Sequence, residues 1–192
     1  MVMPTIRFSF AALLCIILYT ILHPTYNTLM IFAAILIHEA GHIAAIGIIG
    51  GKIERIDITP FGLIIRRSRL ISSYTNDFFV YISGPALNFV FALAFLPCLS
   101  ALDNPLSLFA FQNLSFGLLN LLPVSSLDGG RAIESLILIN HDEEAARRCT
   151  KILSAVVLLC AWIAAIYFLL FTGSGISIFL FSFWLLLSVF MK

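Results

Sequence analysis

The sequence predicts an all-α polytopic membrane protein, with six transmembrane helices and a small membrane-associated β-hairpin between the second and the third. Hydrophobic residues make up 61% of the 192 and charged residues only 11%, an apolar excess that soluble globular domains do not show. Six apolar windows approach the length that crosses a membrane. They cover residues 8–22, 28–49, 77–100, 106–122, 150–171 and 175–191.

The basic residues indicate how the chain crosses the membrane. All 11 Lys and Arg residues lie in or beside the polar stretches at 50–76 and 123–149, or at the termini. The short loops on the other side contain one charge, Asp103. The positive-inside rule therefore predicts that both termini are cytoplasmic. With a net charge of +1 and no continuous basic patch, the partner indicated is the lipid bilayer and not nucleic acid.

The first window, 8–22, is interpreted as a retained transmembrane helix and not as a removed signal peptide. His23-Pro24-Thr25-Tyr26 follows it, where small residues would mark a cleavage site. The four cysteines form no Cys-x-x-Cys pair and three lie in apolar segments. Neither a structural disulfide nor a thiolate zinc site is therefore expected.

The second window contains ionisable residues where charge is least favourable, since His38-Glu39-Ala40-Gly41-His42 lies within an apolar run. Residues four apart share one helix face, so the imidazoles of His38 and His42 can bind one metal ion. Glu39 points away and can take a proton from a metal-held water, its role at this spacing in metalloproteases. Chance is the alternative, but each ionisable residue at bilayer depth costs about 2.5 to 3.5 kcal/mol on insertion scales.

The segment after the second window predicts the β-hairpin. Ile56-Asp57-Ile58-Thr59 alternates apolar and polar residues, Pro60-Phe61-Gly62 can turn the chain, and Leu63-Ile64-Ile65 can return as a second strand. The free edge of this ribbon, including Ile56 and Ile58, would offer backbone donors and acceptors to an extended substrate. The alternative is a basic tether, whose arginines contact anionic lipid head groups.

A catalytic zinc site takes three protein ligands, so a third must come from another segment. The fourth window, Leu106–Leu122, spans about 25 Å as a helix, short of a hydrocarbon core of about 30 Å. Because Pro123 ends or kinks the helix, irregular chain crosses the remaining depth and brings Asp128 within reach of His38 and His42. From spacing alone, a role for Asp128 as the cap of a helix beginning at Gly129 stays open.

Two amides in apolar windows and one charged segment are further features with possible roles. Asn88 in the third window and Asn120 in the fourth could hold a substrate backbone or stabilise an oxyanion, or could form hydrogen bonds between helices. Residues 140–149 place two Glu–Arg pairs at i,i+4 spacing and predict a solvated surface helix. The first and last windows carry no charge and are expected to pack and anchor the chain.

These motifs resemble the site-2 protease family of intramembrane zinc metalloproteases, and most of all its sporulation stage IV FB branch. His38 to His42, Gly84-Pro85-Ala86-Leu87-Asn88, and Asn120 to Gly130 occur in the order and on the spans typical of that family. The resemblance covers essentially the whole chain. It implies one membrane-embedded protease domain over 1–192, with a core at 28–131 and accessory spans at 8–22, 150–171 and 175–191.

The resemblance also implies a site and a substrate. His38, His42 and Asp128 would hold Zn²⁺, and Glu39 would activate water. The substrate would be a membrane-inserted or membrane-associated regulatory protein, cleaved near the cytoplasmic face of a bacterial cytoplasmic or forespore-surrounding membrane, and a regulatory membrane protein could be a further partner.

Two departures from the family pattern stand out. Ser125 and Ser126 replace frequent prolines, and neither a CBS domain nor a PDZ insert is expected. The alternative function is that of a non-catalytic zinc-binding scaffold or transporter, although the chain keeps Glu39 and shows no repeated ligand motif.

Overall fold

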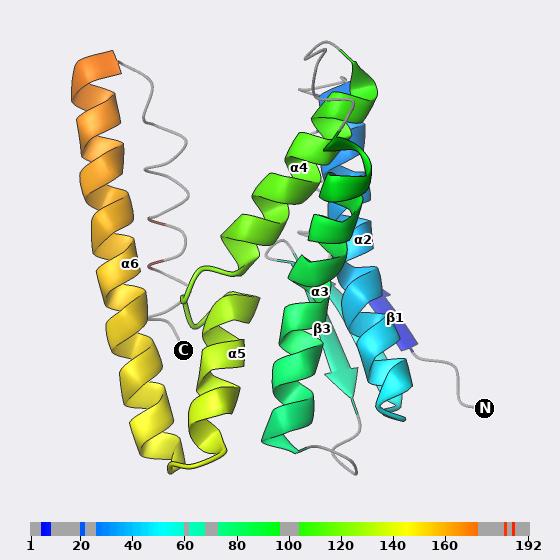
Figure 1. The fold of residues 1–192 in the computed structure, drawn as a ribbon, viewed down its shortest axis with the longest axis vertical. Coiled ribbons are helices and arrows are strands. Elements are labelled where there is room, and N and C mark those ends of the chain that lie inside the picture. The colour runs from blue at the N-terminus through cyan, green and yellow to red at the C-terminus, as the bar shows by residue number, and fades with distance from the viewer. Residues whose placement is uncertain are drawn as a thin grey trace.

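The computed structural model describes residues 5–8, 20–21, 26–59, 62–67, 73–96 and 104–172, together with Phe183 and Leu186. Within these residues the chain is mostly helical (Figure 1). The helices are α2 (Tyr26–Ile48), α3 (Tyr74–Ala94), α4 (Pro105–Asn120), α5 (Asp128–Leu138) and α6 (Glu143–Thr172). The strands are β1 (Thr5–Phe8), β2 (Ile53–Thr59) and β3 (Gly62–Arg67).

Three of the described helices are long and apolar enough to cross a membrane, at Thr28–Ile48, Tyr74–Ala94 and Glu143–Phe171. They correspond to the second, third and fifth predicted windows. The fourth window forms α4, which at 16 residues is as short as the length argument requires. The first and sixth windows, 8–22 and 175–191, lie largely outside the described residues, so the six-span topology stays a prediction.

Polar side chains mark the starts of three helices. The Ser73 Oγ accepts a hydrogen bond from the Asn76 backbone N–H at 3.2 Å, and the Asn104 Oδ1 accepts one from the Leu106 N–H at 3.0 Å. The Asp142 Oδ1 accepts one from the Ala145 N–H at 3.0 Å. Each bond pairs a backbone donor that the first helical turn leaves free.

The surface helix predicted at 140–149 is not a separate element, because α6 runs without a break from Glu143 into the apolar segment. Its predicted ion pairs are present: Arg147 lies 3.6 Å from Glu143 and Arg148 lies 2.7 Å from Glu144. Both pairs are exposed, so the first turns of α6 extend into a polar environment.

The sheet has the order β1-β2-β3, with β1 parallel and β3 antiparallel to β2. Ile56 therefore lies between Ile6 and Ile65, and Ile58 lies between Phe8 and Leu63. The prediction of a free edge at Ile56 and Ile58 is wrong, because β1 pairs with the outer side of β2. A four-residue strand near the N-terminus is too short to be recognised from alternation, and a two-stranded ribbon is marginal without such a partner.

Helix α3 packs against α2, α4 and α5, and α6 packs against α5. The end of α2 and the starts of α3 and α6 lie at the lower end of the view in Figure 1, and the end of α3 and the start of α4 lie at the upper end. The loop between α4 and α5 is held by α6, because Val124 is fully buried against Leu158. In addition, the Ser125 backbone N–H donates to the Ser154 Oγ at 2.9 Å.

Candidate metal centre

Two glycines let α2 and α3 approach each other closely. A Cβ built on Gly41 would lie 2.5 Å from the Ser83 carbonyl oxygen and 2.9 Å from the Gly84 Cα. A Cβ built on Gly84 would lie 2.6 Å from the His42 Cε1 and 2.9 Å from the His38 Cε1. No side chain fits at either position, so the two imidazoles lie directly over the backbone of α3.

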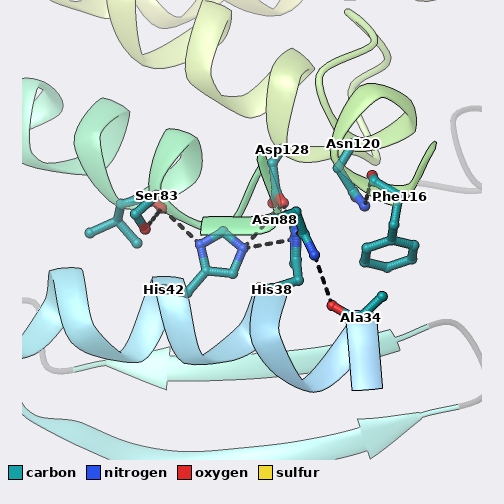
Figure 2. A network of polar contacts seen from close by, with 9 residues as sticks. Ala34, His38, His42, Ser83, Asn88, Phe116, Asn120 and Asp128 are labelled. Atoms are coloured by element: carbon teal, nitrogen blue, oxygen red, sulfur yellow. Dashed lines mark hydrogen bonds and ion pairs between the residues drawn. The ribbon is translucent and has the colours of Figure 1, made fainter. Parts of the chain in front are cut away.

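The side chains of His38, His42 and Asp128 converge at this crossing (Figure 2). The Asp128 Oδ2 lies 2.8 Å from the His38 Nε2 and 3.1 Å from the His42 Nε2, and the two Nε2 atoms are 3.1 Å apart. The three residues are 3%, 7% and 9% exposed. Buried groups of this kind require either mutual pairing or a metal ion.

The remaining ring nitrogens of the two histidines face acceptors. The His38 Nδ1 lies 2.7 Å from the Asn88 Oδ1, and the His42 Nδ1 lies 2.7 Å from the Val80 carbonyl oxygen. Both acceptors require an N–H at Nδ1, which leaves the Nε2 lone pair of each ring directed at the shared centre. This outer contact is the one that fixes the tautomer of metal-binding histidines.

The donor set fits a zinc ion. Two imidazole nitrogens and one carboxylate oxygen are a ligand combination that zinc accepts, and a fourth position would remain for water. Ligand atoms at tetrahedral corners around zinc lie about 3.3 to 3.6 Å apart. The separations of 2.8 to 3.1 Å observed here are slightly shorter, so a small outward movement of the side chains would admit the ion.

Asp128 is the first residue of α5, and its side chain does not cap that helix. Leu127 occupies the N-cap position, and no side-chain cap hydrogen bond is present. A Cβ on Gly129 would collide with the Leu121 carbonyl, and one on Gly130 would collide with the Val124 carbonyl. The loop therefore folds tightly onto the start of α5 and directs the Asp128 carboxylate toward α2.

Glu39 lies on α2 between the two histidines in sequence and is half-buried. Among the residues that the structure describes, none forms a hydrogen bond or ion pair with its carboxylate. A carboxylate beside a metal centre and without such a partner can accept a proton from water, as the motif predicts.

The two predicted amides differ in their surroundings. Asn88 is fully buried, and its NH₂ group donates to the Ala34 carbonyl at 2.9 Å and to the Asn113 Oδ1 at 2.8 Å. The Asn120 amide donates to the Phe116 carbonyl of its own helix at 3.0 Å. Asn88 thus connects α2, α3 and α4, whereas Asn120 lies beside the site without contacting a predicted ligand (Figure 2).

Asn113 was not among the predicted site residues. It lies seven residues before Asn120 and therefore on nearly the same face of α4, and this spacing was the available signal.

Comparison with known proteins also indicates a zinc metalloprotease. Residues 98–164 match Peptidase family M50. The chain is 33% identical over 113 residues to stage IV sporulation protein FB of Bacillus subtilis, an alignment that covers 55% of this chain and 38% of that protein. It is 24% identical over 115 residues to the zinc metalloprotease MJ0392 of Methanocaldococcus jannaschii, covering 57% and 33%. The chain therefore spans less than two fifths of the length of these relatives.

The whole described fold has a counterpart among solved structures. The site-2 protease from Methanocaldococcus jannaschii superposes with a TM-score of 0.69 at 21% identity, covering 96% of this chain and 89% of that one. The general fold expected from the resemblance is therefore confirmed, and the number of spans stays a prediction.

Proposed function

We propose that this chain, which has the fold of a site-2 protease and a Peptidase family M50 match, is an intramembrane zinc metalloprotease. Its substrate would be a membrane-inserted or membrane-associated regulatory protein, cleaved near the cytoplasmic face. The observation that carries the proposal is the convergence of His38, His42 and Asp128 beside Glu39 at a crossing of apolar helices. The name of one relative, a zinc metalloprotease, supports the metal and the proteolytic activity.

Each residue of the site would have a separate role in the reaction. When bound, zinc would polarise the scissile carbonyl and make a water molecule more acidic. Glu39 would take the proton of that water and pass it to the leaving amine. The Asn88 and Val80 oxygens would hold the two imidazoles in the required tautomer, and Asp128 would contribute a negative charge that offsets that of the ion.

The alternative, a non-catalytic zinc-binding scaffold or transporter, has less support. A transporter is expected to repeat ligands along a path. The described part of the chain contains one group of residues that could hold a metal, and Glu39 beside it would serve no purpose in a scaffold.

Removal of the metal tests the proposal directly. The purified chain is reconstituted with tagged membrane-inserted candidate substrates and treated with a strong zinc chelator. We expect cleavage to fall to background and to return when about one equivalent of zinc is added, because the water is not activated without the ion. Unchanged cleavage by protein shown to be metal-free would rule out a metalloprotease.

We also propose that both termini lie on the cytoplasmic side. Single cysteines on a cysteine-free background should react with a membrane-impermeant maleimide from the cytoplasmic side at positions 67 and 147, and from the outside at 103 and 173. The control is Leu36, an exposed residue of α2 that would face lipid, and it should react from neither side. Labelling of position 67 from the outside would reverse the orientation.

A further inference from the structure

A chain of buried amides leads from α4 to the predicted metal ligand His38. The Asn113 NH₂ group donates to the Phe109 carbonyl at 2.9 Å, so the Asn113 Oδ1 faces α3. That oxygen accepts a hydrogen bond from Asn88, whose own Oδ1 lies 2.7 Å from the His38 Nδ1. Asn88 and Asn113 are both 0% exposed, so water does not compete for these bonds.

The hydrogen bonds determine which way the Asn88 amide points. Its two N–H bonds go to two oxygens, those of Ala34 and Asn113. If the amide were rotated by 180°, its oxygen would face these two oxygens and its NH₂ group would face His38. The rotated form would present a donor to the His38 Nδ1, and the ring would then carry its hydrogen on Nε2, where a metal ligand needs a lone pair.

We propose that Asn113 is a positioning residue for metal binding: acting through the Asn88 amide, it selects the tautomer of His38 that leaves Nε2 free for zinc. The hydrogen bonds of the Asn113 side chain go to Asn88 and Phe109, and none goes to a predicted metal ligand. Its own orientation follows from the Phe109 carbonyl. Asn113 therefore adds a second oxygen acceptor of fixed direction beside the Ala34 carbonyl, and both favour the same orientation of the Asn88 amide. The inference rests on the proposed zinc site and goes beyond it in assigning a role to α4.

A variant of Asn88 separates this role from ordinary packing. Asn88→Asp places a carboxylate beside the His38 Nδ1, and a carboxylate presents an acceptor whichever way it is turned. The selection by Asn113 then becomes unnecessary. Carboxylates in this position are common partners of zinc-binding histidines, so Asn88→Asp should still bind zinc, and its own affinity is the reference for every change made in that background.

The test measures zinc affinity by competition with a chromophoric chelator, together with the visible absorption of the Co²⁺-substituted protein. Asn113→Leu should lower zinc affinity about 10-fold in the parent, within the range typical of residues that orient metal ligands. In the Asn88→Asp background the same change should cost less than about 2-fold. Asn113→Asp, which keeps an oxygen facing Asn88, should restore the parent Co²⁺ spectrum. Asn113→Ser, too short to reach Asn88, replaces the leucine variant if that variant does not fold.

Ala110→Gly is the matched control, because Ala110 is buried on the same helix, one turn before Asn113. The change lowers the helix propensity of α4 but leaves the hydrogen bonds of Asn88 and Asn113 in place. Zinc affinity should therefore stay within about 2-fold of the parent. Equal losses from Asn113→Leu in both backgrounds, or no loss in either, would overturn the inference. Because affinity is measured and not proteolysis, a chain that binds zinc normally but cleaves nothing would contradict the proposed function alone.

Discussion

Glu39→Gln should abolish proteolysis while the protein still binds about one equivalent of zinc. The amide has the shape of the carboxylate but cannot take a proton, and loss of a general base typically lowers a rate by about 10² to 10⁴-fold. Glu39 makes no hydrogen bond or ion pair within the described residues, so the change should not destabilise the fold. The measurements are cleavage of a reconstituted substrate, bound zinc and thermal unfolding on the same preparation.

Glu54→Gln is the matched control, because Glu54 is exposed on β2 and does not belong to the group of residues that could hold the metal. It should cleave at the parent rate. If Glu39→Gln retained cleavage within about 10-fold of the parent, the base would have to be sought elsewhere.

Asp128→Ala should lose both zinc and activity. The change removes one of three converging ligand atoms and leaves two buried imidazoles without the carboxylate that lies 2.8 and 3.1 Å from them. We expect zinc affinity to fall by more than about 100-fold, beyond the effect of residues that only orient ligands. Chelator competition measures the affinity, and the cleavage assay should decline in parallel.

Asp142→Ala is the control for Asp128→Ala, because it shows the effect of losing an aspartate that only caps a helix. The Asp142 carboxylate does accept a hydrogen bond from the Ala145 N–H at the start of α6. Its loss should lower the free energy of unfolding by about 1 kcal/mol and leave zinc affinity unchanged. Undiminished zinc affinity in Asp128→Ala would mean that another residue completes the site.

Local patterns explain how much of the site could be predicted. The His38–His42 spacing requires only a helix, and the position of Asp128 follows from a helix too short to cross the membrane. The role of Asn88 could not be decided in advance, because an amide in an apolar span has the same pattern whether it contacts a substrate, a helix or a ligand. Asn113 and β1 contribute through partners distant in sequence, and no local periodicity reports such pairing.

The prediction of the fold from the sequence had the same limit. The apolar windows located α2, α3 and the membrane segment of α6, since each needs only a run of hydrophobic residues. The continuity of α6 was missed because its polar first turns and apolar remainder have different compositions. A change of surroundings along one helix looks in the sequence like a change of element.

The hydrogen bond between the Ser125 N–H and the Ser154 Oγ bears on how such chains can diverge. Proline has no amide hydrogen, so a chain with proline at position 125 would have no donor for a hydroxyl at position 154. Such a chain would gain its stiffness from the ring instead. The two residues are therefore alternative ways of immobilising one loop, and a substitution at either position changes which residues are acceptable at the other. A helix that contributes no ligand to the metal centre would in this way constrain the loop that precedes Asp128.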